Sequence, residues 1–225
     1  MEVLETARRK KIPTLSEYDS KRVLAEYGIP VTREKLVKNG KDAVAAAEAI
    51  GYPVVLKATG PTLTHKTELD AIRLNLKDAK EVRKAVKDLK DGLKGQKLQG
   101  LLVQEMVKGQ RELVMGLTRD PQFGPCVMFG LGGIYTEILK DVSFRVAPLT
   151  RQDALDMISE IRGYRLLAGA RGEKPADVPA ITEAILRLAQ LAMDFPEMKE
   201  LDINPLLAAD PGQGAVAVDC RIVIG

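Results

Sequence analysis

Two pairs of strand-like segments, each joined by a tight turn, constrain the fold of this chain most strongly. The first pair, ELVMGLTRD and CVMFGL, turns at TRDPQFGP within residues 112–131. The second pair lies within residues 200–224, where ELDINPLLAA and AVAVDCRIVI flank the turn DPGQG. Segments joined by so short a turn can pair only as antiparallel neighbours. The C-terminal half is therefore expected to contain an antiparallel sheet.

The remaining segments add helices and further strands. Residues 14–30 begin with Thr14 and Glu17 in capping-box spacing and end at Gly28 and Pro30, as a helix does. Helices are also expected at residues 41–51, 78–93, 151–161 and 181–193, and strands at residues 54–58, 71–76, 100–106 and 142–149. This succession predicts an α+β fold with two lobes, divided near residues 100–110, and a ligand in the cleft between the lobes.

The composition limits the classes of function. Of the 225 residues, 45% are hydrophobic and 29% are charged, which suits a globular protein with a sizeable core. A net charge of +3 does not indicate nucleic-acid binding. The sequence also has no Trp and only four Phe, so it offers few side chains on which bases could stack. We therefore expect no nucleic-acid partner.

The sequence also argues against a membrane protein and a zinc site. No apolar run approaches the ~20 residues that a membrane-spanning helix needs, and the N-terminal MEVLETARRKKIP is charged. We therefore expect a cytoplasmic protein without membrane contact. Cys126 and Cys220 lie in apolar segments and are expected to be buried thiols, and a single histidine does not allow an ordinary Cys/His zinc site.

The single histidine, His65, follows the apolar segment YPVVLKA, which ends near Lys57. A solitary histidine does not by itself indicate a function. Lys57 must reach solvent, an acid or a ligand, because an unpaired buried ammonium is costly. The residues alone leave two interpretations of Lys57 open, a side chain that extends to solvent and a clamp for a phosphate group.

Two further segments have both a structural and a functional interpretation. FGLGGI, at residues 129–134, lacks the GxGxxG pattern followed by a helix, so it is either a tight turn or a backbone cradle for an anion. Glu105 and Glu112 flank the short connection MVKGQR. Such a connection can hold an adenine through backbone groups while a carboxylate takes the ribose hydroxyls. Neither pattern decides the function in isolation.

The C-terminal hairpin carries oxygen-bearing side chains on both strands. Asn204 and Asp219, counted outward from the DPGQG turn, come close to pairing across the hairpin. Oxygen ligands without a nearby imidazole or thiolate suit Mg²⁺. Asp202, two residues before Asn204, should point to the same face. In the simpler interpretation, Asn204-Pro205 is only a bend and Asp219 is a charge at a strand end.

Taken together, these segments resemble a known family. YPVVLKA, HKTE, VQEMV, RELVMGLTRDPQFGPCVMFGLGGIYTEILKD, FRVAPL and LDINPLL…VAVD occur in the order found in the ATP-grasp domain of ADP-forming acyl-CoA synthetases. The resemblance is greatest to the β subunits of ADP-forming acetate–CoA ligases, which are related to succinyl-CoA ligase. It runs from about residue 14 to the C-terminus. It implies an ATP-grasp fold with lobes at residues 14–103 and 104–225, preceded by an N-terminal extension at residues 1–13.

The resemblance also implies an activity. The family converts acyl-CoA, ADP and phosphate reversibly into acid, CoA and ATP, and passes the phosphate through histidines. His65 occupies the position of the histidine of the β subunit, so it is expected to carry phosphate covalently. The implied cofactors are ATP/ADP and Mg²⁺. The implied partner is an α subunit with the CoA-binding and acyl-phosphate site, and the implied assembly is an α₂β₂ heterotetramer.

The family pattern gives a role to each candidate residue. It implies that Lys57 binds the nucleotide phosphates and that Glu112 is the acid on the ribose side. The adenine segment would comprise Glu105, Met106 and Val107. The Mg²⁺ ligands would be Asn204 and Asp219, and the acid that orients the histidine ring would be Asp202. Phosphate or the histidine loop would be contacted by Gly132 and Gly133.

One departure from the family pattern lies after the histidine. Many relatives have Gly-Gly where this chain has Asp70 and Ala71. The replacement adds a carboxylate and removes the close backbone approach that glycine allows. This replacement leaves open a second interpretation of the chain, as a subunit that senses nucleotides without turnover. A third interpretation is a β subunit like that of succinate–CoA ligase.

Overall fold

The computed structural model describes residues 2–60, 70–96, 98–107, 111–133, 140–169 and 172–225, which form two compact units. The smaller unit is continuous in sequence and consists of Thr32–Lys108. The larger unit combines Met1–Val31 with Gly109–Gly225. Each unit has its own sheet and its own hydrophobic core. Helices and antiparallel strands occur in both, which confirms the α+β class.

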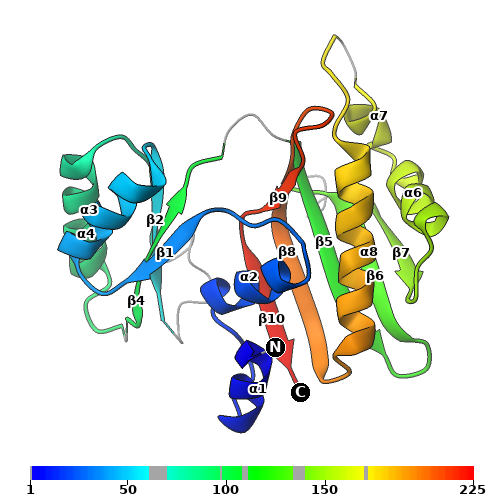
Figure 1. Ribbon diagram of the computed structural model, residues 1–225, viewed down its shortest axis with the longest axis horizontal. Coiled ribbons are helices and arrows are strands. Elements are labelled where there is room, and N and C mark those ends of the chain that lie inside the picture. Colours follow the sequence, from blue (N-terminus) through cyan, green and yellow to red (C-terminus); the bar gives the residue numbers. More distant parts are fainter. Residues whose placement is uncertain (1, 61–69, 97, 108–110, 134–139, 170–171) are drawn as a thin grey trace. The chain divides into compact units, whose positions relative to one another are not determined.

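The smaller unit is a four-stranded antiparallel sheet with two helices on one face (Figure 1). Its strands lie in the order β1 (Glu34–Val37), β4 (Gly100–Glu105), β2 (Val54–Thr59) and β3 (Ile72–Leu76). The helices are α3 (Gly40–Ile50) and α4 (Ala79–Gly92). Asn39 caps α3 and Asp78 caps α4, each accepting a backbone hydrogen bond from the residue three positions on. Val82, Val86 and Leu89 of α4 are buried, as their spacing predicts.

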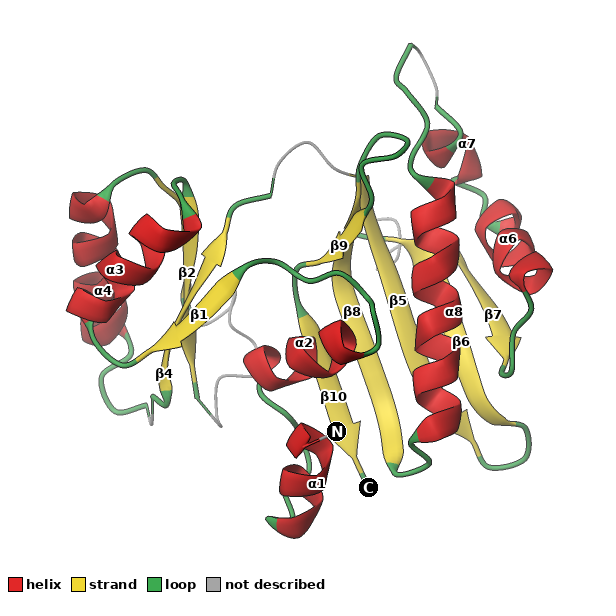
Figure 2. Ribbon diagram, in the orientation of Figure 1, coloured by secondary structure: helices red, strands yellow, loops and turns green. Residues whose placement is uncertain are grey.

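The larger unit is a six-stranded antiparallel sheet, with the long helix α8 on one face (Figure 2). The strand order is β10–β8–β5–β6–β7, and β9 pairs with β8. The strands are β5 (Arg111–Asp120), β6 (Gly124–Leu131), β7 (Val142–Val146), β8 (Met198–Ala208), β9 (Ala215–Ala217) and β10 (Cys220–Ile224). The helices of this part of the chain are α6 (Arg151–Glu160), α7 (Tyr164–Leu167) and α8 (Val178–Asp194). Both expected hairpins are present, β5 with β6 and β8 with β9.

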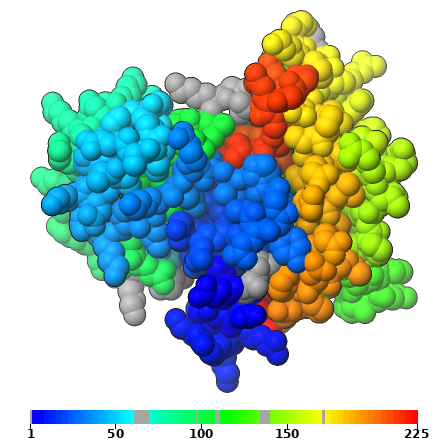
Figure 3. All heavy atoms as spheres, viewed as in Figure 1, coloured from blue at the N-terminus to red at the C-terminus, as the bar shows by residue number. Residues whose placement is uncertain are grey.

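The N-terminal segment belongs to the larger unit. Two helices, α1 (Glu2–Arg9) and α2 (Glu17–Glu26), precede the smaller unit, and α2 contacts β10. Backbone bonds join Leu15 N to the Ile222 oxygen (2.9 Å) and Ala217 N to the Pro30 oxygen (2.8 Å). In the space-filling view, the blue atoms of the N-terminal helices form the surface at the centre and bottom of the molecule as drawn (Figure 3).

This packing differs from the lobes expected from the sequence. Residues 14–31 lie with the C-terminal part rather than in a lobe 14–103, and residues 1–13 are no mere extension, because Val3 and Leu4 are buried in the larger core. The cap of α2 also differs from the expectation. Ser16, not Thr14, caps this helix, since its side chain accepts a hydrogen bond from Asp19 N, while Thr14 forms a bridge with Val223.

The central strand β8 contains a bulge. Leu113 of β5 pairs with Leu206, and Met115 pairs with Ile203, so Asn204 and Pro205 together face the single residue Val114. Two residues opposite one is the arrangement of a β-bulge, which turns side chains out of the regular alternation. The neighbouring ladder is also interrupted, because β9 ends at Ala217 and β10 begins at Cys220. The two interruptions are adjacent, because the bulge residues Asn204 and Pro205 lie opposite Val218 and Asp219.

Within the described ranges, the structure has no helix that combines the length and the apolarity needed to cross a membrane.

Candidate functional site

Lys57 lies in the central strand β2 of the smaller unit, where Leu102 of β4 and Ile72 of β3 flank it. Its neighbours Leu56 and Ala58 belong to the core beneath α3 and α4. Because side chains alternate along a strand, Lys57 points to the opposite face of this sheet. The residue is only 4% exposed. Lys57 therefore lies on the face of the sheet opposite α3 and α4, where its ammonium is positioned to contact an acidic group.

Glu105 ends β4 and is fixed by Arg33. Its carboxylate accepts hydrogen bonds from the Arg33 backbone N (2.8 Å) and Nε (2.7 Å). The Glu105 N–H donates to the Arg33 oxygen (2.9 Å), and the Met106 N–H donates to the Pro53 oxygen (3.2 Å). The amides of Glu105 and Met106 are therefore already bonded within the unit. An adenine bound along residues 105–107 would have to bond to the carbonyl groups of this segment and to the Val107 amide.

Glu112 lies directly beside Gly132 and Gly133. The Gly132 N–H donates to the Glu112 oxygen (2.8 Å), and a Cβ at Gly132 would lie 3.1 Å from the Glu112 carbonyl carbon. Gly133 has φ +62°, and a Cβ there would lie 3.6 Å from Glu112 Oε2. The first glycine is needed for close approach and the second for its left-handed backbone. The structure thus joins a carboxylate and a glycine pair that the sequence presents as separate segments.

Asn204 and Asp219 lie side by side where the β8 ladder is interrupted. The Asn204 N–H donates to the Asp219 oxygen (3.2 Å), and the Val218 N–H donates to the Pro205 oxygen (3.0 Å). The near pairing expected across the hairpin is therefore present. Asn204 is exposed and Asp219 is half-buried. An amide oxygen and a carboxylate on adjacent strands form a donor set that suits a hard cation such as Mg²⁺.

Asp202 lies next to this pair on β8, opposite Gly116 of β5 and Arg221 of β10. Part of its side chain reaches solvent, yet partial burial of the carboxyl raises its pKa above the usual value. The carboxylates of Asp219 and Glu200 raise this pKa further, and Arg221 opposes the rise. Burial also raises the pKa of the Cys220 thiol, so this cysteine stays protonated at neutral pH.

Arg221 is a residue that the sequence reasoning missed. It lies opposite Asp202, and its Nη2 is 3.7 Å from Glu200 Oε2. Along β10 the buried Cys220 is followed by the exposed Arg221, and this alternation is the signal in the sequence that could have placed Arg221 on the open face. The guanidinium offsets part of the negative charge that Asp202, Asp219 and Glu200 bring to this region.

Asp202 and Arg221 line a pocket of about 200 Å³ on the larger sheet. The lining comes from strands β5, β6, β7, β8 and β10: Gly116, Leu117, Thr118, Met128, Phe144, Glu200, Leu201, Asp202 and Arg221. Phe144 is 49% exposed. The pocket is therefore apolar at the β6–β7 end and charged at the end near Asp202.

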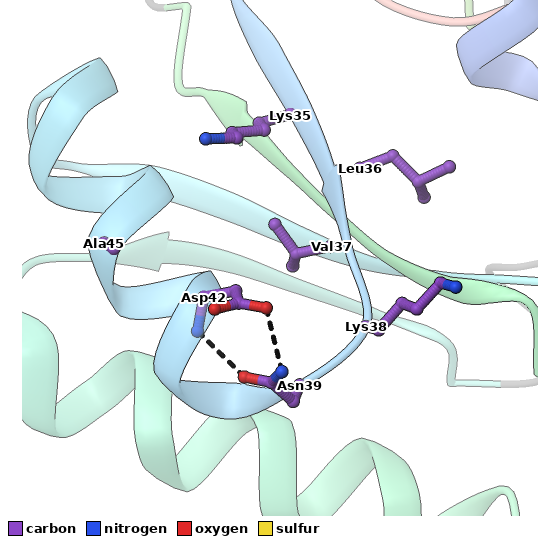
Figure 4. Close-up of a pocket in the computed structure, with 7 residues that line it drawn as sticks. All are labelled: Lys35, Leu36, Val37, Lys38, Asn39, Asp42 and Ala45. Atoms are coloured by element: carbon purple, nitrogen blue, oxygen red, sulfur yellow. Dashed lines mark hydrogen bonds between the residues drawn. The ribbon is translucent and has the colours of Figure 1, made fainter.

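A second pocket, of about 380 Å³, lies in the smaller unit between β1 and the start of α3 (Figure 4). It is lined by Lys35, Leu36, Val37, Lys38, Asn39, Asp42 and Ala45. The two hydrogen bonds drawn in Figure 4 join Asn39 and Asp42 and belong to the cap of α3. None of the residues expected from the sequence to bind a ligand lines this pocket.

His65 lies outside the residues that the structure describes, but the departure that follows it does not. Asp70 has φ +51°, a backbone conformation that glycine adopts more easily. Both carboxylate oxygens of Asp70 accept from Arg73, Oδ1 from Nη1 at 2.8 Å and Oδ2 from Nη2 at 2.9 Å. Ala71 is buried. The added carboxylate is therefore engaged by a guanidinium, and Asp70 keeps the backbone that a glycine would have there.

Among the described residues, no group of three or more His, Cys, Asp or Glu side chains is placed to hold a metal ion. A cation bound at Asn204 and Asp219 would thus take most of its ligands from outside these side chains. This is usual for Mg²⁺, which is commonly held by one or two carboxylates together with water and phosphate oxygens.

Comparisons with known proteins place this geometry among solved relatives. The model of the ATP-grasp domain matches residues 6–224. The chain is 45% identical to the β subunit of acetate–CoA ligase [ADP-forming] I of Pyrococcus furiosus, over 99% of this chain and 97% of that protein. It matches a structure of Ca. Korarchaeum cryptofilum acetyl-coenzyme A synthetase 1 in complex with coenzyme A, Ca-AMPCP and HgCl⁺, with a TM-score of 0.96 and 42% identity, covering 100% of this chain and 99% of that one.

A second structure of that synthetase contains coenzyme A and Mg-AMPPCP, and its phosphohistidine segment points towards the nucleotide-binding site. It matches with a TM-score of 0.90 and 41% identity, and covers 100% of this chain and 99% of that one.

Proposed function

Because the chain belongs to the ATP-grasp family, among the β subunits of ADP-forming acetate–CoA ligases, we propose that it is the nucleotide-binding subunit of an acid–thiol ligase. The reaction is acyl-CoA + ADP + phosphate ⇌ acid + CoA + ATP. The same relationship confirms the fold class and the family that the sequence motifs indicated, and it favours this activity over that of a succinate–CoA ligase subunit.

The observation that carries the proposal for this chain is the meeting of Asn204 and Asp219 at the interrupted ladder. These two residues would hold Mg²⁺ through one amide oxygen and one carboxylate, together with phosphate oxygens of the nucleotide. When bound, the ion offsets negative charge on the phosphates during phosphoryl transfer.

The other positions to which the family pattern gives a role hold the nucleotide. Lys57 donates charge-assisted hydrogen bonds to its phosphates. The adenine binds along Glu105–Val107, using carbonyl groups and the Val107 amide because the first two amides are engaged. Glu112 accepts from the ribose hydroxyls. The glycines at 132 and 133 bring backbone close to the phosphate path beside Glu112.

His65 carries the phosphoryl group between this nucleotide and the acyl-phosphate chemistry. A neutral imidazole is nucleophilic at physiological pH, and a covalent carrier protects the group from transfer to water. In the direction of ATP formation, ADP takes the phosphoryl group from the imidazole nitrogen and the imidazole is released unmodified. Asp202 accepts a hydrogen bond from the second ring nitrogen and orients the ring. Arg221, opposite Asp202, offsets charge where the phosphorylated ring comes to lie.

The partner is an α subunit that contains the CoA site and forms the acyl phosphate, in an α₂β₂ assembly located in the cytoplasm. This division of labour leaves the choice of acid to the α subunit.

Labelling with γ-labelled ATP and Mg²⁺ tests the proposal on the isolated chain. We expect the protein to gain a label that is lost in acid and kept in base, as a phosphoramidate is, and His65→Ala to abolish it. Nucleotide binding by His65→Ala should stay close to that of the parent, because Lys57 and the adenine segment are unchanged. A protein that binds ATP and gains no label would instead be the nucleotide-sensing subunit.

A further inference from the structure

An ion pair of α2 is buried beneath the segment that joins β9 to β10. Lys21 Nζ lies 3.1 Å from Glu17 Oε1, one turn away on the same helix, and the two side chains are 1% and 2% exposed. Removing both charges from water costs several kcal/mol each, so a buried pair is seldom the most stable choice for a helix. An apolar pair would fit the surrounding core more cheaply. The buried charges of Glu17 and Lys21 therefore indicate a role other than stabilising the fold.

The ammonium also contacts the segment that carries a proposed metal ligand. Lys21 Nζ donates to the Val218 oxygen at 3.0 Å, and Val218 is bonded covalently to Asp219. The Val218 N–H donates to the Pro205 oxygen, and the Asp219 oxygen accepts from the Asn204 N–H. The Lys21 side chain of α2 thus contacts the segment Val218–Asp219, which also forms backbone hydrogen bonds with Asn204 and Pro205 of β8.

The sheet alone does not hold this stretch. The ladder of β8 with β9 ends at the pair Leu206 and Ala217, and the ladder of β8 with β10 resumes at Ile203 and Cys220. Val218 and Asp219 lie between the two ladders, opposite the bulge of β8. A backbone outside a regular ladder needs other partners to keep one conformation. The ammonium of Lys21 supplies one of them from the helix side.

We propose that Lys21, held by Glu17, is a positioning residue that fixes the Val218–Asp219 backbone so that the Asp219 carboxylate and the Asn204 amide converge on the cation of a Mg·nucleotide. This inference rests on the proposed function, because it gives Asp219 and Asn204 their metal. Lys21 does not itself act on the nucleotide in this scheme. Lys21 acts through the Val218 backbone. Loss of its ammonium should therefore lower the affinity for Mg·ADP and leave the affinity for metal-free ADP nearly unchanged.

The test compares variants of the full chain by calorimetry, with ADP titrated in the presence of Mg²⁺ and in the presence of a chelator. The double variant Glu17→Gln/Lys21→Met removes the ammonium without leaving a carboxylate buried alone. We expect its affinity for Mg·ADP to fall about 10-fold, as for other residues that support metal ligands, and its affinity for metal-free ADP to change less than about 2-fold. Arg22→Met is the matched control, because Arg22 lies on the same helix in an exposed pair with Asp19, and both affinities should stay unchanged.

A second variant separates the contact to Val218 from the ion pair. Glu17→Gln alone keeps the ammonium and its bond to the Val218 oxygen, and the amide oxygen replaces the carboxylate as an uncharged acceptor. Its Mg·ADP affinity should therefore fall much less than that of the double variant. A loss as large as that of the double variant would overturn the role of the Val218 contact. A folded double variant that binds Mg·ADP as the parent does, with only a lower Tm, would show that the pair is merely structural. A parent chain that binds ADP equally with and without Mg²⁺ would overturn the metal site itself, and this inference with it.

Discussion

The two units carry their proposed binding residues in different kinds of strand. In the smaller unit, Lys57 lies within an unbroken ladder that runs from Val54–Glu105 to Thr59–Gly100. In the larger unit, Asn204 lies in a bulge and Asp219 lies between two strands. A regular strand fixes the direction of each side chain by alternation alone, whereas an interrupted one can bring oxygens from neighbouring strands together. The second arrangement needs support from outside the sheet, and it is also the one that suits a metal ion.

The largest expected effect tests the interrupted region. Asp219→Ala removes the only charged member of the proposed pair of metal ligands. We expect affinity for Mg·ADP to fall about 100-fold, the upper end of losses for metal-site substitutions, while metal-free ADP binds nearly as before. Calorimetry with and without Mg²⁺ measures both affinities, and Asp156→Ala on α6 is the control. Unchanged Mg·ADP affinity in a folded Asp219→Ala would count against the assignment.

The regular region should respond differently. Lys57→Met keeps the length of the side chain and removes its charge, so the phosphates lose a charged donor. We expect ADP affinity to fall about 10-fold whether or not Mg²⁺ is present, since a charge-assisted hydrogen bond contributes about 1.5 kcal/mol or more. The same titrations report this, and the exposed Lys80→Met serves as the control. A loss seen only with Mg²⁺ would remove the contrast between the two units.

A smaller effect is expected at the glycine pair beside Glu112. A Cβ in Gly132→Ala would lie 3.1 Å from the Glu112 backbone, which cannot move as a flexible side chain can. We expect the free energy of unfolding to fall by about 1–3 kcal/mol, as for other overpacked sites. Gly92→Ala in α4 is the comparison, because a Cβ there meets nothing within 4 Å. Urea denaturation measures both, and equal stability of the two variants would contradict the close approach at Gly132.

The smallest effect concerns Asp202 and depends on pH. Its carboxyl has a raised pKa in the folded protein, so the folded state binds this proton more tightly than the unfolded state does. At neutral pH the carboxylate is charged in both states, and its charge then lowers the free energy of unfolding. Asp202→Asn should therefore be slightly more stable than the parent at pH 7, by less than about 1 kcal/mol because the side chain reaches solvent.

This advantage should shrink as the pH falls through the raised pKa towards the usual value of about 4. Thermal unfolding between pH 4 and pH 8 follows the difference. In the complete ligase, the same variant should transfer phosphate more slowly, because the neutral amide orients the ring without stabilising its charge. A variant that is less stable than the parent at pH 7 would show that the Asp202 charge is favourable in the fold.

The sequence predicted what depends on local pattern. The turns at DPGQG and TRDPQFGP gave the hairpins, the short apolar run VVLKA gave the strand that contains Lys57, and the spacing of α4 gave its buried face. The bulge at Asn204 was not predicted as such, because one extra residue in a strand leaves no mark on a period of two. The bulge brings Asn204 close to Asp219. That approach was predicted from the sequence only because the two residues lie at similar distances from the DPGQG turn.

What depends on distant partners was missed. Lys21 and Glu17 lie on a helix rich in charge, where the simplest expectation is an exposed face, and only the packing of α2 on β10 buries them. The segment 14–31 was assigned to the other lobe for the same reason, since its bonds reach Ile222 and Ala217. The bond between Arg73 and Asp70 is local, because the two residues are three positions apart, and it engages the carboxylate that stands where relatives have glycine.

The packing of α2 on β10 has a consequence for how the protein is made. The smaller unit is one continuous stretch and can fold as soon as its last strand has left the ribosome. The larger unit must wait, because Lys21 and its acceptor Val218 are 197 residues apart. During synthesis the two N-terminal helices therefore remain without the strand that they cover. We expect this interval to be when the nascent chain most depends on chaperones.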